Sequence, residues 1–290
     1  MNLIRTAGRI AAAIVAVMII GVGESAMAEA AAAEPIVIAD FSRQPDVAPF
    51  EGFYAWMAEN GWRRGIGDPR YFFIRDGRLH LVSKPGPIYD ARYRMALFDR
   101  EKLLRGLENK VLLRITPEKF RIDAAADPAL RFVFTPLTLP SAEADLRDSG
   151  KNDAAFYLLV FFDSTAREFE GYEIPRAVAY VWANRPWSAP VASDPDYADF
   201  MRYIAVGFGK AGLGESQTIS RKIVEDYRLA FPEHEDVPDI TGVGLMIDSN
   251  TLGGTAESAL SRIQILMPPA PADDPGSSLR SNPPPRRPTF

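Results

Sequence analysis

Short runs of β-branched and aromatic residues recur along the chain, and few helical segments separate them. A parallel α/β sheet needs a crossover helix between successive strands, so this pattern favours antiparallel pairing. We therefore predict an all-β fold, a β-sandwich or jelly roll with long loops and one or two short helices. The runs with the clearest character of central strands are 154–162, 176–182, 202–208 and 240–247.

The strongest local signal is a hairpin within "YFFIRDGRLHLVS". Asp76 and Gly77 separate two runs of strand-forming residues, and both residue types tolerate the positive φ angles of a tight turn. The pattern predicts strands at 71–75 and 78–83. Further elements are expected as strands at 92–98, 130–134 and 262–266, a short helix after Asp99, and one helical turn within 225–236 before Pro232.

The N-terminal segment has the composition of a secretory signal peptide. Arg5 and Arg9 precede an uncharged apolar run at 10–22, and Ala26-Met27-Ala28 is the small-x-small pattern that signal peptidases cut. The apolar run is too short for a membrane-spanning helix, which requires about 20 residues. The sequence predicts a signal peptide over 1–28 and a periplasmic or secreted protein with no membrane span after cleavage.

The rest of the chain divides into one predicted domain and a tail. Residues 34–267 are long enough to bury a sizeable core, which favours a single β-sandwich domain. Residues 268–290 are rich in proline and contain almost nothing that could pack, so this tail is predicted to be disordered.

Charge and cysteine content exclude several classes of partner and chemistry. The formal net charge is −5, and removal of the signal peptide makes it more negative, which argues against nucleic acid and anionic membranes as partners. The absence of cysteine excludes disulfides, a lipoprotein anchor and thiol nucleophiles.

The most distinctive loop is "DSNTLGGTAES", which follows the apolar run that ends at Ile247. Asp248 and Asn250 suggest calcium, because hard cations prefer clustered oxygens. The helix–loop–helix calcium template fails, because Leu252 and Ala259 stand where oxygen ligands are needed, although a different oxygen cage stays open. The alternative is a structural turn, in which both side chains bond their own backbone and Gly253-Gly254 permits the reversal.

Tryptophan and arginine residues stand near a neighbouring strand end. Trp182 and Trp187 flank "ANRP", which contains Arg185. An exposed indole offers a sugar ring a flat apolar face, while Asp, Asn and Arg can bond its hydroxyls. The alternative for each tryptophan is core packing, because large aromatic side chains dominate sandwich interiors.

Motifs for catalysis or cofactor binding are weak. The two histidines have no metal-ligand spacing, and no Gly-x-Ser-x-Gly elbow is present. "GFGKAG" at 207–212 has the glycine spacing of a dinucleotide turn but lacks a following amphipathic helix, so a hairpin loop is favoured. A glycosidase needs two carboxylates across a groove, and the residues that remain candidates for such a pair are Glu168, Glu170, Glu173 and Glu257, although "REFEGYE" is typical of a solvated loop.

Residues 153–266 resemble the bacterial family of exported proteins of unknown function DUF3047. The likeness is carried by "NDAAFYLLVFF", "AVAYVWANR", the arginine and Asp-Tyr of "SRKIVEDY", and "ITGVGLMIDSNTLGGTAESALSRIQIL". The resemblance implies a β-sandwich similar to galactose-binding and other carbohydrate-binding modules. It implies no reaction, because a fold alone does not confer function.

These observations favour an exported binding module over an enzyme. We expect non-covalent binding of a saccharide or another polar envelope ligand, without a cofactor, calcium being the one cation left open. The alternatives are a glycan hydrolase with a carboxylate pair that includes Glu257, and an envelope scaffold whose tail binds a protein. The candidate ligand-binding residues are Asp153, Trp182, Arg185, Asp248, Asn250 and Thr251.

Overall fold

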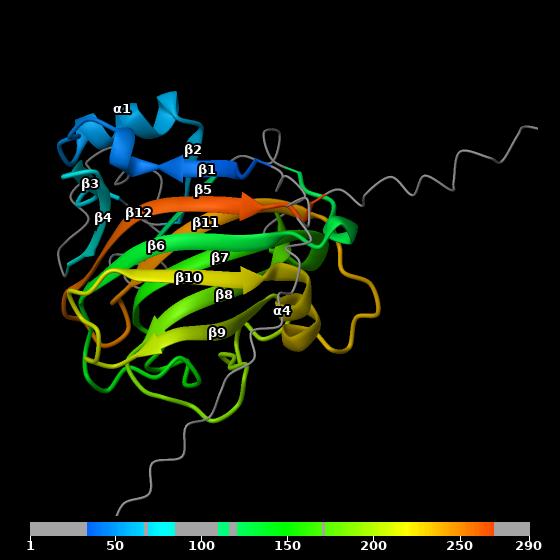
Figure 1. The fold of residues 1–290 in the computed structure, drawn as a ribbon. Coiled ribbons are helices and arrows are strands. Elements are labelled where there is room, and N and C mark those ends of the chain that lie inside the picture. The colour runs from blue at the N-terminus through cyan, green and yellow to red at the C-terminus, as the bar shows by residue number, and fades with distance from the viewer. Residues whose placement is uncertain (1–33, 67–68, 85–109, 116–120, 170–171, 270–290) are drawn as a thin grey trace, which may run out of the picture. The chain divides into compact units, whose positions relative to one another are not determined.

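The computed structural model describes residues 34–66, 69–84, 110–115, 121–169 and 172–269 (Figure 1). The predicted signal peptide, the strand at 92–98, the helix after Asp99 and nearly all of the predicted tail lie outside these residues. None of the helices in the described part is long and apolar enough to cross a bilayer.

Two sheets form the fold, and Figure 1 shows the first sheet in front of the second. The first sheet has the order β10-β6-β12-β4-β3, and β1 also pairs with β12. Its strands are β1 (Ile36–Asp40), β3 (Phe73–Arg75), β4 (Arg78–Ser83), β6 (Ala129–Thr138), β10 (Gln217–Lys222) and β12 (Ala256–Leu266). The prediction of an all-β sandwich is confirmed.

The second sheet has the order β2-β5-β11-β7-β8-β9. Its strands are β2 (Trp62–Ile66), β5 (Lys110–Ile115), β7 (Ala154–Phe169), β8 (Tyr172–Ala183), β9 (Met201–Phe208) and β11 (Ile240–Asp248). Strands β8 and β9 are parallel, and the other pairs of described strands are antiparallel.

The predicted hairpin at Asp76-Gly77 is present, whereas the hairpin loop favoured for 207–212 is wrong, because this segment joins β9 and β10, which lie in different sheets. Asp76 has a φ of 50° and Gly77 a φ of 68° in the turn between β3 and β4, as the Asp-Gly signal predicts. Strands β7 and β8 extend beyond the predicted limits, and Glu168 pairs in register with Glu173. The interpretation of 167–173 as a loop is wrong for 167–169 and 172–173, because these residues belong to β7 and β8.

Both faces of β7 are covered, which explains its nearly continuous apolar sequence. Phe156, Leu158 and Val160 face the other sheet and lie in the main core, where Phe134 stacks on Phe156 with 4.3 Å between ring centroids. Tyr157 and its neighbours on the opposite face form a second apolar cluster with side chains of segments 139–153 and 184–200.

Two α-helices lie in the described part of the domain. Helix α1 (Glu51–Glu59) buries Phe53, Trp56 and Met57, whose spacing is that of one helical face. Helix α4 (Ile223–Ala230) is longer than the single turn predicted, and it ends two residues before Pro232, which cannot continue a helix.

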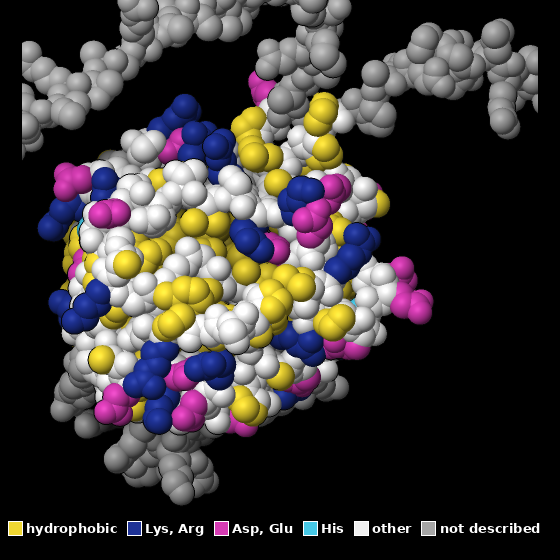
Figure 2. All heavy atoms as spheres, turned by 60° about the horizontal axis from the view of Figure 1, so that its bottom comes forward, with side chains coloured by type: hydrophobic (Ala, Val, Ile, Leu, Met, Phe, Trp, Pro, Cys, Tyr) yellow, Lys and Arg dark blue, Asp and Glu magenta, His cyan; other side chains and the backbone are white. Residues whose placement is uncertain are grey.

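The sandwich is open between edge strands β9 and β10, where Val206 and Ile219 are half buried against the core. Figure 2 looks toward this side of the molecule. Hydrophobic side chains are visible in the middle of this face, and charged side chains are more frequent around its margin.

Candidate functional site at the loop end

The six predicted site residues all lie at one end of the sandwich. Strands β6, β8 and β11 end there, and β7 and β12 begin there. We call this region the loop end, and define it by the three segments 139–153, 184–200 and 249–255. The candidate ligand-binding residues chosen from the sequence therefore lie at the same end of the fold.

Asp153 fastens the third segment to the first. Its side chain is buried, and its two carboxylate oxygens accept hydrogen bonds from the backbone amides of Thr251 and Leu252, both at 2.9 Å. The hydroxyl of Thr251 donates to Oδ1 of Asn152 at 2.7 Å. These bonds hold segment 249–255 in one position relative to the start of β7.

Asp194 adds the second segment to this arrangement. Nδ2 of Asn152 donates to Oδ2 of Asp194 at 2.7 Å, and the amide of Asp196 donates to Oδ1 at 2.9 Å. The hydroxyl of Tyr157 donates to the carbonyl of Asn152 at 2.9 Å. Sequence reasoning missed Asp194, although an aspartate directly before Pro195 is a common turn signal.

The loop after β11 has hydrogen bonds typical of a structural turn, which was the alternative to a calcium site. Oδ1 of Asp248 accepts from the amide of Asn250 at 3.2 Å, and the hydroxyl of Ser249 donates to the carbonyl of Gly254 at 3.2 Å. Ser258 lies inside β12 and donates to the carbonyl of Ala155, so it caps no further element. Asp248 is buried, whereas Thr251 is exposed and Asn250 is half buried.

The buried tyrosines beside these carboxylates are proton donors. Burial raises the pKa of Tyr157 well above its usual value, and the nearby carboxylates, first that of Asp248, raise it further. Burial and the carboxylate of Asp194 raise the pKa of Tyr203 in the same way. Both phenols therefore keep their protons at neutral pH, and the hydroxyl of Tyr157 donates to the carbonyl of Asn152.

A metal centre has no support from the arrangement of ligands. Among the residues that the structure describes, no group of three or more His, Asp or Glu side chains lies close enough to hold a metal ion. Asp153 and Asp194 direct both of their carboxylate oxygens to protein donors. A calcium cage therefore stays a prediction from the sequence.

Trp182 belongs to the core. Its indole is 4% exposed, and Nε1 donates to the carbonyl of Gly209 at 3.0 Å. The ring lies against Gly207, where a Cβ atom would come within 2.1 Å of an indole carbon, so only glycine fits. This ring is not available as a flat surface for a sugar. Trp187 is half buried and packs edge-on against Phe208, with ring centroids 5.1 Å apart.

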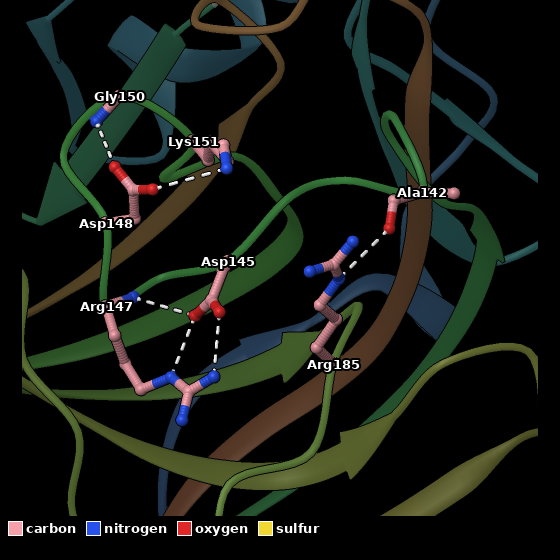
Figure 3. A network of polar contacts seen from close by, with 7 residues as sticks. All are labelled: Ala142, Asp145, Arg147, Asp148, Gly150, Lys151 and Arg185. Carbon is pink, nitrogen blue, oxygen red and sulfur yellow. Dashed lines mark hydrogen bonds and ion pairs between the residues drawn. The ribbon is translucent and has the colours of Figure 1, made fainter.

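Arg185 is exposed, and Figure 3 shows it with four other charged residues, Asp145, Arg147, Asp148 and Lys151. Its Nε donates to the carbonyl of Ala142 at 3.4 Å, and next to it Nδ2 of Asn184 donates to the carbonyl of Ser141 at 2.6 Å. These two contacts hold the start of segment 184–200 against segment 139–153. In this view one terminal nitrogen of the guanidinium group points to the side of Asp145, and the other lies on the side of Ala142.

The other two cations in Figure 3 have carboxylate partners. Arg147 binds Asp145 through two nitrogens, at 2.9 and 2.7 Å, and Lys151 lies 3.5 Å from Asp148. The hydrogen bond from Arg147 lowers the pKa of Asp145 below its ordinary value, and the charge of Arg185 contributes to the same shift. Arg185 forms no ion pair with a carboxylate in the described part of the chain.

The carboxylate proposed for hydrolysis lies at the margin of the loop end, where Glu257 pairs with Thr138, the last residue of β6. Glu257 is on β12, and its Oε1 lies 3.2 Å from Nδ1 of His80 on β4. The ring of His80 stacks on Phe73, with centroids 4.5 Å apart. Glu257 therefore faces a histidine. The side chains of Glu168 and Glu173, and the whole of Glu170, lie outside the described part.

Comparison with known proteins identifies a family for this chain. A family model described as "Protein of unknown function (DUF3047)" matches residues 90–264, which confirms the resemblance and extends it toward the N-terminus. A search of curated proteins gave no match.

The chain is also similar, at very low sequence identity, to several solved structures. A family 12 xyloglucanase from Bacillus licheniformis is 6% identical, with a TM-score of 0.37, over 70% of this chain and 96% of that one. The xyloglucanase domain of NopAA from Sinorhizobium fredii is 8% identical, with a TM-score of 0.35, over 71% of this chain and 92% of that one. A family 11 xylanase from Neocallimastix patriciarum is 6% identical, with a TM-score of 0.26, over 71% of this chain and 92% of that one. Such likeness concerns the β-sandwich fold alone.

Proposed function

Because the chain belongs to the DUF3047 family, whose description assigns no reaction, we propose a function from the loop end itself. The protein is an exported binding module that holds a saccharide, or another polar ligand of the cell envelope, non-covalently. The export signal and the negative charge are consistent with a neutral ligand outside the cytoplasm.

The observation that carries this proposal is the anchored, exposed guanidinium of Arg185. Nε is held by the carbonyl of Ala142, and within the described part of the chain the group forms no ion pair with a carboxylate. A guanidinium is a donor only, so it is matched by the acceptor oxygens of sugar hydroxyls. Trp187 lies two residues further on and adds a partly exposed aromatic surface.

The buried polar residues support this surface without touching the ligand. Asp153 and Asp194 fix the three segments before a ligand arrives, and such preorganisation avoids the entropy cost of ordering loops on binding. Of the six candidates from the sequence, we propose Arg185, Asn250 and Thr251 as ligand contacts, because their side chains are exposed or half buried. Asp153 and Asp248 position the loop, and Trp182 packs the core.

Calorimetric titration with cello-, xylo- and chito-oligosaccharides tests the proposal. We expect binding by the wild type, and a loss of about tenfold in affinity for Arg185→Ala, because a hydrogen bond from a charged donor contributes about 1.5–3 kcal/mol. Arg228→Ala is the matched control, because Arg228 is an exposed arginine on α4 at the opposite end. Failure of every series to bind, or equal affinity for the two variants, contradicts the proposal.

A further inference from the structure

Phe50 has a backbone conformation that is normally reserved for glycine. Its φ is 65° and its ψ is −124°, at the N-cap of α1. Side chains with a Cβ atom are strained in this region. The conformation is fixed on both sides, because the amide of Phe50 donates to the carbonyl of Arg70 at 3.2 Å and its carbonyl accepts from the amide of Tyr54 at 3.1 Å.

Burial of the ring does not compensate for this strain. Phe50 is 50% exposed, so much of its apolar surface remains in water. Its ring meets the half-buried Tyr71 edge to face, with centroids 6.1 Å apart at 75°. The ammonium group of Lys84 lies 5.7 Å from the centroid of Tyr71. Strain that persists at an exposed aromatic residue points to a function of the ring.

The aromatic pair Phe50–Tyr71 lies toward the loop end. Lys84 directly follows β4, whose last residue, Ser83, pairs with Ala256 at the start of β12. The hydroxyl of Ser83 also lies 2.7 Å from that of Ser249, in segment 249–255. The first sheet thus brings the pair to the same end of the sandwich as the proposed saccharide surface.

We propose that Phe50 and Tyr71 form an aromatic subsite for one ring of an oligosaccharide whose other end lies at Arg185. This inference rests on the proposed function and names its ligand class as an extended, neutral oligosaccharide. The apolar face of a sugar ring packs on the exposed ring of Phe50, and Lys84 and the hydroxyl of Tyr71 are donors for its hydroxyls.

Two variants separate the ring of Phe50 from its backbone strain. Phe50→Gly and Phe50→Ala both remove the ring, but only glycine relieves the positive φ. We expect the glycine variant to melt about 2–6 °C above the alanine variant, because Ala is strained at this φ. Both variants should bind cellohexaose or chitohexaose about three- to tenfold more weakly than the wild type, with little change for cellobiose or chitobiose.

The possible outcomes distinguish the two proposals. Leu229→Ala is the control, because Leu229 is an apolar residue on α4 that is 44% exposed at the opposite end, and it should leave affinity unchanged. If the wild type binds a hexasaccharide and both Phe50 variants bind it equally well, the subsite is refuted and the proposed function stands. If the wild type binds no saccharide, both proposals fall. A glycine variant no more stable than the alanine variant overturns the argument from strain.

Discussion

Replacement of Asp226 by alanine is expected to lower the free energy of unfolding by about 3–5 kcal/mol, as removal of one partner from a buried ion pair does. Its side chain is 5% exposed, and Oδ2 accepts from the hydroxyl of Tyr180 and from Nε of Arg221, each at 2.9 Å. Oδ1 accepts a second bond from Arg221. The change would leave the buried phenol of Tyr180 and the half-buried guanidinium of Arg221 without this acceptor. Helix α4 would also lose the hydrogen bonds that link it to β8 and β10.

Urea denaturation measures this effect, and two variants serve as controls. Tyr180→Phe removes a single donor and should cost about 1 kcal/mol. Glu225→Ala, at the neighbouring position of α4, removes only an exposed contact with Lys222 and should leave the midpoint unchanged. Burial and then Asp226 raise the pKa of Tyr180, so the phenol remains a donor from acid to neutral pH. Equal midpoints for Asp226→Ala and Glu225→Ala would show that the network does not stabilise the fold.

Replacement of Asp153 by alanine is expected to lower the free energy of unfolding by about 2–4 kcal/mol. The carboxylate is buried and accepts from the amides of Thr251 and Leu252, so its removal leaves two backbone donors unpaired. For a domain of this size the melting temperature should fall by roughly 4–16 °C. Because the loop end is then less ordered, saccharide affinity should also fall although Asp153 touches no ligand.

Asp148→Ala is the control for this change. Asp148 lies in the same segment, but it is exposed and accepts from Gly150 and Lys151 at the surface. It should leave melting and affinity nearly unchanged. Asp153→Asn, which keeps one acceptor oxygen, should fall between the alanine variant and the wild type. A melting temperature for Asp153→Ala equal to that of Asp148→Ala would contradict the role given to this carboxylate.

Local sequence patterns were sufficient for the fold class. The Asp76-Gly77 turn and the apolar runs predicted the β3–β4 hairpin and the central strands, because turn chemistry and strand periodicity are local properties. Pairing partners were not predictable. Strand β12 pairs with β1, β4 and β6, and periodicity says which residues share a face without naming the neighbouring strand.

The two tryptophans beside Arg185 show why exposure was harder to predict. Trp182 shares its face of β8 with Val178 and Tyr180, which suggests burial. The opposite face carries small apolar residues that are also buried, so the sequence gives no polar side by which to orient the strand. The sequence therefore predicted a sugar-binding surface at Trp182, which is buried. Trp187 is the half-buried one of the two.

Some polar contacts of the loop end could be predicted from the local sequence, and others could not. The Asx turn at Asp248 follows from local chemistry. The contacts of Asp153 with Thr251, and of Asn152 with Asp194, join residues far apart in the chain, so no local pattern reveals them. The strained backbone of Phe50 has no sequence signal either, because glycine is the residue normally expected there.

Mapping of the bound saccharide by amide chemical shifts tests the central claim most directly. The protein is titrated with whichever hexasaccharide shows binding by calorimetry. We predict the largest shift changes at residues 184–187 and 250–252, which contain Arg185, Trp187, Asn250 and Thr251. Largest changes at α4 and residues 231–239, or along the open side between β9 and β10, would show that the loop end is not the binding surface.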